Sequence, residues 1–155
     1  MKIILAIDGS EHRKLTVEEI ADRPFPPKTE VRMVTVYTKP SKMVAAEAVM
    51  VSEDYYPEIN LIALKSATNI AKDAAKILNK GNPKLIITTA VIDGSPAQVI
   101  FREAEAFGAD LIVVGSHGHG AFAGFLLGSV SQSVALHAKC SGGNCSQVKY
   151  KTINS

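Results

Sequence analysis

The sequence predicts an α/β fold in which helices cover both faces of a mainly parallel sheet. Three observations lead to this fold class: short apolar runs rich in β-branched residues, longer amphipathic stretches between them, and a length of 155 residues. Buried strands of parallel sheets form nearly continuous apolar runs, and the connections between them are usually helices. Because this length suits one compact domain, a single sheet is expected.

The expected strands are short and compact, as strands covered on one or both faces should be. They are Ile3–Ile7, Val31–Tyr37, Leu85–Val91 and Leu111–Val114. No internal repeat or interdomain linker interrupts the series. The pattern is therefore that of successive strand-helix-strand units.

Two helices are expected before the third strand. The first covers Glu11–Ala21 and ends before Pro24–Pro27, because proline lacks an amide hydrogen and fixes φ. The second, Pro57–Leu78, carries an apolar stripe suited to cover a sheet. The stripe consists of Ile59, Ile62, Ser66, Ile70, Ala74 and Ile77, widened by Ala63, Ala67 and Ala71. The stretch Thr38–Tyr56 has no clear period, which leaves a loop or a short helix as alternatives.

Two later helices are predicted from capping patterns. Ser95 is the expected cap of one helix, with Pro96 at its first position and a glutamine three residues after the cap. This helix should end near Gly108. Ser129 repeats the cap-and-glutamine spacing and should begin a last helix that reaches about His137.

Composition excludes several kinds of partner. Seventeen Lys and Arg against fifteen Asp and Glu give a net charge of +2, too balanced for a broad nucleic-acid surface. The stretch Gly120–Gly128 is far shorter than the roughly 20 apolar residues of a membrane-spanning helix, and the N-terminal apolar run is too short for a signal peptide. The two cysteines, Cys140 and Cys145, are expected to be free thiols. A cytoplasmic protein with a local anion site is the expectation.

A glycine-rich loop is the candidate anion site. After the strand Leu111–Val114 come Gly115-Ser116-His117-Gly118-His119-Gly120, and later Gly128 and Ser129 open a helix. Glycine lets backbone amides approach an anion, and a helix N-terminus presents unpaired N–H groups, so phosphate suits this arrangement. Ser129 and Ser131 could add hydroxyl donors. The alternative is that these glycines only form turns.

The spacing Gly115-x2-Gly118-x9-Gly128-Ser129 resembles the nucleotide-binding signature of the universal stress protein family, G-x2-G-x9-G-[ST], in its ATP-binding branch. Three further segments are similar to that family. They are Ile7-Asp8-Gly9-Ser10, Val34-Thr35-Val36 and Gly94-Ser95-Pro96-Ala97. The resemblance runs from about Met1 to Cys140.

The resemblance implies a Rossmann-like fold of the adenine nucleotide alpha hydrolase type, with an open, mainly parallel five-stranded sheet in the order 3-2-1-4-5. It also implies an ATP site in which Asp8 lies beside ribose and adenine and Val36 meets adenine through its backbone. The full implied set is Ile7, Asp8, Gly9, Ser10, Val36, Val114, Gly115, Gly118, His119, Gly128, Ser129, Val130 and Ser131. Independently, Asp8 and Gly115 each follow the carboxyl end of a strand, where ligands bind in such sheets. For Asp8, a turn or cap is the alternative role.

The expected ligand is ATP, with AMP or ADP as alternatives, and the metal is Mg²⁺ or Mn²⁺ carried by the phosphates rather than by protein side chains. His119 stands where the family most often has arginine, which implies a weaker or pH-dependent phosphate contact. A metal site built from His117, His119, His137 and Cys140 is the less favoured reading of these histidines.

Binding is favoured over turnover. The sequence has no G-x4-G-K-[ST], G-x-S-x-G or H-E-x-x-H motif, so no catalytic residue can be named. A regulatory or stress-response role through an unknown protein partner is therefore expected. A slow ATPase or nucleotidyl-transferring enzyme and a nucleotide-free interaction module are the alternatives.

The domain expectation divides the chain at residue 140. Residues 1–140 form the nucleotide-binding domain, and residues 141–155 form an atypical C-terminal segment. Relatives in the family have a fifth strand there that commonly forms a dimer contact, whereas Ser141–Asn144 is polar and Gln147–Ile153 alternates only weakly. The segment is either a displaced fifth strand or an altered end without one. A homodimer weaker than the family norm, or joined by a different surface, is expected.

Overall fold

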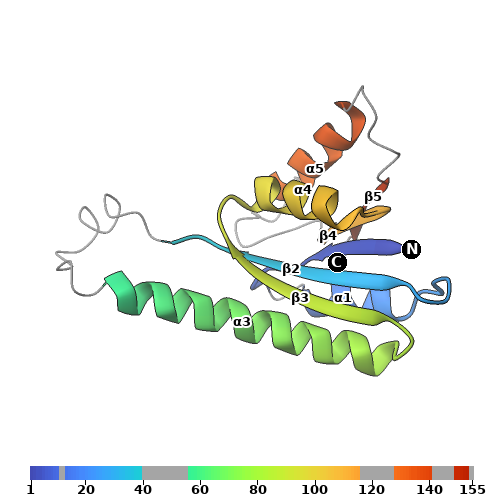
Figure 1. Ribbon diagram of the computed structural model, residues 1–155, viewed down its shortest axis with the longest axis horizontal. Coiled ribbons are helices and arrows are strands. Elements are labelled where there is room, and N and C mark those ends of the chain that lie inside the picture. Colours follow the sequence, from blue (N-terminus) through green and yellow to red (C-terminus); the bar gives the residue numbers. More distant parts are fainter. Residues whose placement is uncertain (11–12, 40–55, 116–127, 141–148, 154–155) are drawn as a thin grey trace.

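The computed structural model describes residues 1–10, 13–39, 56–115, 128–140 and 149–153. Strands and helices alternate along these residues (Figure 1). The elements are β1 (Lys2–Ala6), α1 (Arg13–Ala21), β2 (Glu30–Tyr37), α3 (Tyr56–Gly81), β3 (Ile86–Asp93), α4 (Pro96–Phe107), β4 (Leu111–Gly115), α5 (Ser129–Cys140) and β5 (Lys149–Ile153). The expected stretch Thr38–Tyr56 lies mostly outside the described residues.

The strands form one sheet in the order β3-β2-β1-β4-β5, and every pair is parallel. The predicted α/β class with a parallel sheet is confirmed. The C-terminal segment is expected to be either a displaced fifth strand or an altered end without one. In the structure, residues 149–153 lie beside β4, with Leu111 opposite Lys149. Because the strands are parallel, their carboxyl ends gather at one edge of the sheet.

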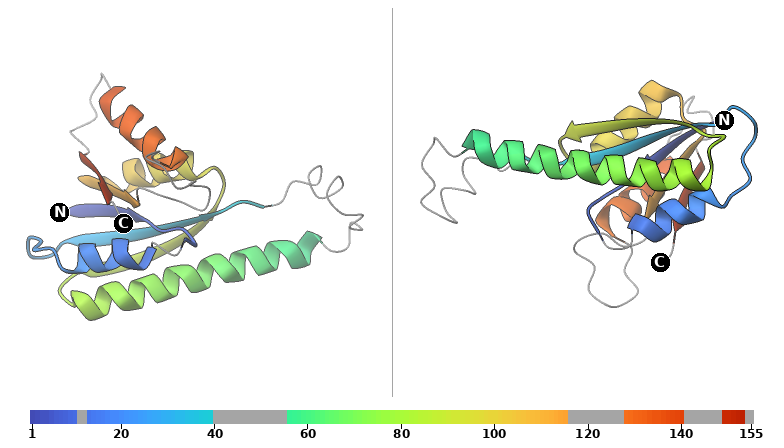
Figure 2. Two further views of the ribbon diagram at one scale, coloured as in Figure 1. Left: turned by 180° about the vertical axis from the view of Figure 1, so that it is seen from behind. Right: turned by 90° about the horizontal axis from the view of Figure 1, so that it is seen from below.

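Helices cover both faces of the sheet, α1 and α3 on one face and α4 and α5 on the other (Figure 2). Along β1, Ile3 and Leu5 face the first pair of helices and Ile4 faces the second, as the period of two in a strand requires. Each face buries its own apolar cluster. The first contains Ile3, Leu5, Ile7, Val17, Ile20, Ala21, Val31, Met33, Ala74, Leu78, Leu85 and Val113. The second contains Ile4, Val34, Val99, Ile100, Ala104, Ala109, Ile112, Val114 and Val134.

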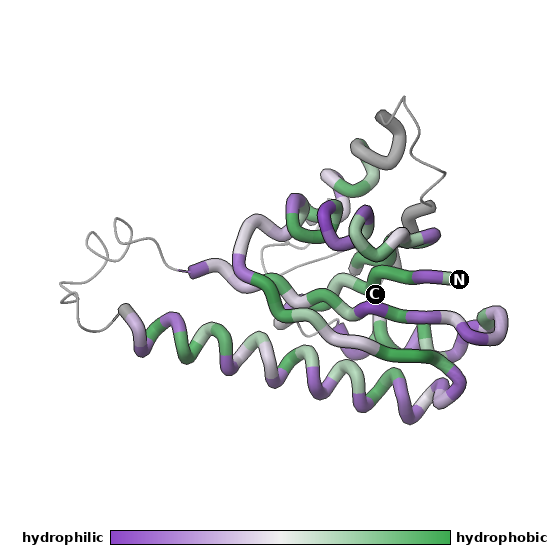
Figure 3. Tube along the Cα trace, viewed as in Figure 1, coloured by the Kyte–Doolittle hydropathy of each residue, from purple (hydrophilic) through white to green (hydrophobic). Residues whose placement is uncertain are grey.

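The apolar stripe expected on α3 is only partly correct. The buried residues are Ala67, Ala71, Ala74 and Leu78, whereas Ile62 is 66% exposed. A helix of 26 residues is about 39 Å long and a strand of eight is about 27 Å. The amino-terminal part of α3 therefore extends beyond the sheet (Figure 1). Apolar residues recur along that part as well (Figure 3), but none of the described strands lies beneath them.

The predicted helix caps also need correction. Ser95 occupies the expected position before α4 with an extended backbone, but its side chain makes no capping hydrogen bond. Gly108 ends α4 as expected, in a left-handed conformation with φ of 65° that glycine adopts without strain. At α5 the predicted cap is one residue late. Gly128 accepts the first helical hydrogen bond, from the amide of Gln132 at 2.9 Å, and Ser129 is already helical.

Among the described residues, no helix is both long and apolar enough to cross a membrane.

Candidate functional site

The described residues of the implied nucleotide site gather at the carboxyl edge of the sheet. Ile7–Ser10 follows β1, Val36 lies near the end of β2, and Val114 and Gly115 end β4. Gly128–Ser131 spans the start of α5. These segments adjoin because β1 pairs with both β2 and β4. Gly118 and His119 lie outside the described residues.

Asp8 builds the turn that follows β1. Its Oδ1 accepts hydrogen bonds from the amide of Ser10 at 3.1 Å and from the Ser10 hydroxyl at 2.6 Å. Arg13, at the start of α1, donates to the carbonyls of Gly9 and Ser10 at 3.2 and 3.4 Å. The turn role expected as an alternative for Asp8 is therefore present. A carboxylate can accept about four hydrogen bonds, and Ser10 supplies two of them to Asp8. The turn therefore fixes the orientation of the carboxylate while leaving it able to accept further hydrogen bonds.

Ser131 ties the start of α5 to the end of β4. Its hydroxyl donates to the carbonyl of Gly115 at 2.5 Å, and the residue is only 3% exposed. Ser129 is exposed and Val130 is half-buried. The expected pair of hydroxyl donors is thus divided: the Ser131 proton is used inside the protein, and Ser129 remains at the surface. The first amides of α5 are the helix N-terminal donors that suit an anion.

An apolar patch lies at the same edge of the sheet. Ala6, Val36, Ile92 and Val130 are partly buried and pack against the second apolar cluster. They come from β1, β2, β3 and α5. A partly exposed apolar surface beside polar turns can bind a planar heteroaromatic ring. Sequence reasoning missed Ala6 and Ile92, although Ile92 is directly opposite Val36 in the sheet.

An ion pair closes the β2-β3 side of this edge. The Lys39 ammonium lies 2.9 Å from Asp93 Oδ2, and the Lys39 amide donates to Asp93 Oδ1 at 3.2 Å. The hydrogen bond and the negative charge of Asp93 raise the pKa of Lys39. In turn, the hydrogen bond from Lys39 lowers the pKa of Asp93. The pair holds the chain leaving β2 against the end of β3, next to Val36 and Ile92.

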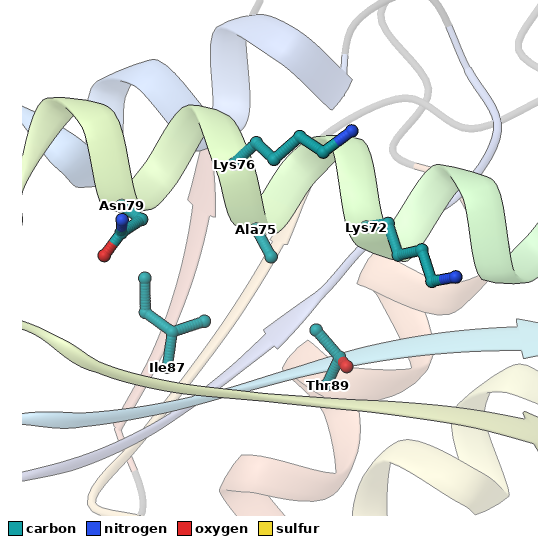
Figure 4. A pocket seen from close by; sticks show the side chains of 6 residues that line it. All are labelled: Lys72, Ala75, Lys76, Asn79, Ile87 and Thr89. Atoms are coloured by element: carbon teal, nitrogen blue, oxygen red, sulfur yellow. The ribbon is translucent and has the colours of Figure 1, made fainter.

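A separate cleft of about 460 Å³ lies between α3 and β3 (Figure 4). It is formed by a lateral edge of the sheet, away from the strand ends that hold Asp8 and Gly115. Within the described ranges, no group of three or more His, Cys, Asp or Glu side chains could hold a metal ion. His117 and His119 lie outside those ranges, as does the side chain of His137.

Comparison with curated proteins finds universal stress proteins. The chain is 27% identical over 138 residues to a universal stress protein of Thermus aquaticus, covering 89% of this chain and 93% of that protein. It is 42% identical over 57 residues to the universal stress protein Rv2623 of Mycobacterium tuberculosis. The latter match covers 37% of this chain but only 18% of that relative, so the chain matches under a fifth of its length.

Solved structures share the fold. Hypothetical protein MJ0577 matches with a TM-score of 0.77 at 21% identity, over 99% of this chain and 95% of that one. A universal stress protein in complex with cAMP matches with a TM-score of 0.61 at 19% identity, over 99% and 96%. An Arabidopsis thaliana member with AMP bound matches with a TM-score of 0.54 at 17% identity, over 99% and 91%.

The family model of the universal stress proteins matches residues 1–141. That match covers nine-tenths of the chain and includes every residue of the implied nucleotide site. The chain therefore belongs to the universal stress protein family.

Proposed function

We propose that this chain binds an adenine nucleotide, with ATP as the ligand, at the carboxyl edge of its sheet. One observation carries the proposal. The Asp8 turn, the apolar patch that includes Val36 and the start of α5 converge at the carboxyl ends of the strands. They offer a carboxylate for ribose hydroxyls, an apolar surface for a base and helix amides for phosphates. Gly118 and His119 belong to the proposed site through the sequence signature alone.

Two structural relatives support the ligand class, since one is a complex with cAMP and another has AMP bound. The base and ribose are common to all these ligands. The two ligands differ in how they present their phosphate, which is where the glycine loop and α5 would act. Mg²⁺ or Mn²⁺ would enter with the phosphates of ATP and would need no protein carboxylate.

Binding without rapid turnover is the mechanism that we propose. Among the described residues of this edge, Asp8 is the only acidic side chain of the implied site, and its Oδ1 is already engaged by Ser10. The nucleotide would instead bias the glycine loop and the start of α5, whose conformation a protein partner could read. A regulatory role in the cytoplasm is part of this proposal.

The test is calorimetric titration of the full chain with AMP, ADP, ATP, cAMP and GTP. Adenine nucleotides should bind and GTP should bind more weakly. Gly128→Val should weaken ATP binding, because a branched side chain would stand where phosphate approaches the backbone. Gln98→Val, which introduces the same side chain on the exposed face of α4, is the control. Unchanged ATP affinity in a folded Gly128→Val protein would contradict the site, and rapid phosphate release would support the enzyme alternative.

We also propose a homodimer. The sheet has two lateral edges, and β5 forms one of them. An unpaired strand edge is a template for pairing with a second copy of the same strand. Native mass spectrometry over a range of concentrations would report retained nucleotide and subunit number together. A purely monomeric chain at high concentration would contradict the dimer.

A further inference from the structure

Strand β3 is the outermost strand on the side of the sheet opposite β5, and it lacks the usual protection against pairing. Natural edge strands are commonly interrupted by proline, bulges or charged side chains. β3 keeps an unbroken eight-residue register with β2, from Ile86 opposite Glu30 to Asp93 opposite Tyr37. It contains no proline or glycine, and its sole charged residue is Asp93, at the end. Within the part of the chain that the structure describes, β3 pairs with β2 alone.

The cleft between α3 and β3 runs along this edge. Ile87 and Thr89 form its strand side, and Lys72, Ala75, Lys76 and Asn79 form its helix side (Figure 4). On the other side of the strand, Ile86 is 52% exposed and Thr88 is exposed. The edge therefore offers backbone groups flanked by lysines on one side and by an apolar side chain on the other.

The two lysines are exposed and weakly engaged. Lys76 lies 3.3 Å from Asp73 of the same helix, with both side chains more than half exposed. Such surface pairs contribute little and are readily exchanged. Lys72 has no ion pair among the described residues. Both ammonium groups can therefore turn to an incoming anion at little cost.

The spacing of the lysines suits a strand. Four residues along a helix advance about 6 Å, and two residues along a strand advance about 6.6 Å. Alternate side chains of an added strand lie on the same side of the sheet. Two carboxylates separated by one residue would therefore meet Lys72 and Lys76 together.

We propose that β3 accepts an extended acidic segment of another protein as an additional strand. Its backbone would pair with the outer edge of β3, and carboxylates at two alternate positions would meet Lys72 and Lys76. The intervening side chain would lie on the other face, beside the exposed side chains of Ile86 and Thr88. This interaction surface is separate from the nucleotide site and does not depend on it.

Charge decides against a second copy of the same strand as the occupant. In a pairing of β3 with β3, the incoming strand would bring no acidic side chain before Asp93. It would also bring its own Lys72 and Lys76 toward the same edge. Like charges would then face one another without compensating carboxylates.

The test uses the full chain and a labelled, end-blocked peptide, Thr-Val-Glu-Val-Glu-Val-Thr, titrated by fluorescence anisotropy at low salt. The combined change Lys72→Ala and Lys76→Ala should weaken binding by about threefold to thirtyfold, as expected for the loss of two exposed ion pairs. The matched control is Lys65→Ala with Lys80→Ala, exposed lysines of the same helix that do not line the cleft. That control should change affinity less than twofold.

Charge exchange protects the test against a folding artefact. The combined variant Lys72→Glu and Lys76→Glu should no longer bind the acidic peptide. It should instead bind the same peptide with lysine in place of glutamate. The wild-type chain should not bind the lysine peptide. Equal binding of both peptides by the wild-type chain, or affinity that does not respond to either lysine pair, would overturn the proposal.

Strand addition itself is tested with backbone-methylated peptides. An added strand presents alternate amides to β3 and the others to solvent. Methylation of one alternate set should abolish binding, and methylation of the other should leave it unchanged. Equal effects of the two methylation patterns would overturn strand addition, as would self-association of the chain that competes with the peptide.

Discussion

Asp8 has two roles that a pair of substitutions can separate. In the structure its Oδ1 accepts the amide and hydroxyl hydrogens of Ser10, and under the proposed function its carboxylate also accepts ribose hydroxyls. Alanine removes both roles. Asparagine keeps an oxygen that can hold the turn, but replaces the second carboxylate oxygen with an NH₂ donor.

The expected loss of stability in Asp8→Ala follows from the two hydrogen bonds to Ser10. Ser10 is only 7% exposed, so Asp8→Ala leaves its polar groups poorly solvated. At about 0.5–1.5 kcal/mol for each bond, the free energy of unfolding should fall by roughly 1–3 kcal/mol. Asp8→Asn should lower it by less than about 1 kcal/mol, because both bonds to Ser10 can persist. Urea unfolding of the two variants measures this difference.

The magnitude for binding follows from the ribose contact. Asp8→Ala should weaken AMP, ADP and ATP alike by about 1–3 kcal/mol, because the lost contact is to the shared nucleoside. Asp8→Asn should also weaken all three, although its turn remains. Calorimetric titration provides the affinities. Wild-type affinity in Asp8→Asn, or a loss confined to ATP, would refute the ribose role and leave Asp8 as a turn residue alone.

Three further predictions concern stability and titration. Leu78→Ala should lower the free energy of unfolding by about 2–5 kcal/mol, because Leu78 is fully buried, whereas Leu61→Ala, at a residue 48% exposed, should change it much less in the same urea titration. Gly94→Ala should lower the free energy of unfolding by roughly 1–3 kcal/mol, because φ is 145° and the new Cβ would lie 3.0 Å from a methyl group of Val99. Thermal unfolding measures this change, and a variant as stable as the wild type would contradict the backbone conformation of Gly94. NMR titration should find the pKa of Asp93 below 3.8 and that of Lys39 above 10.5, so their pair stabilises the fold between those ordinary values. Its contribution should be lost as pH falls through the lowered pKa of Asp93 or rises through the raised pKa of Lys39. Lys39→Met should raise the pKa of Asp93 toward its ordinary value, while the hydrogen bond from the backbone amide of residue 39 remains.

The strand ends show how far the site could be predicted from sequence. Asp8 and Gly115 each follow an apolar run, and the carboxyl ends of parallel strands meet at one edge, so their convergence was predictable. The contribution of Ile92 was not, because it depends on β3 lying beside β2 with Ile92 opposite Val36. The inward direction of Ser131 was also not predictable. Its hydroxyl is directed by the distance between α5 and the end of β4, which local spacing does not contain.

The sequence alone determined the α/β fold class of this protein, because apolar runs of strand length alternate with amphipathic runs of helix length. It also contains the glycine signature, which follows a strand. Tertiary structure alone decided which parts of that pattern are buried. Apolar residues recur along α3, yet Leu78 is fully buried and Ile62 is largely exposed, because the helix is longer than the sheet beneath it. The edge position of β3 does not follow from periodicity; the strand order implied by the family resemblance predicts it, and among the described strands β3 pairs with β2 alone. An apolar run can form a central or an edge strand, and only the order of the strands leaves β3 with an open side beside Lys72.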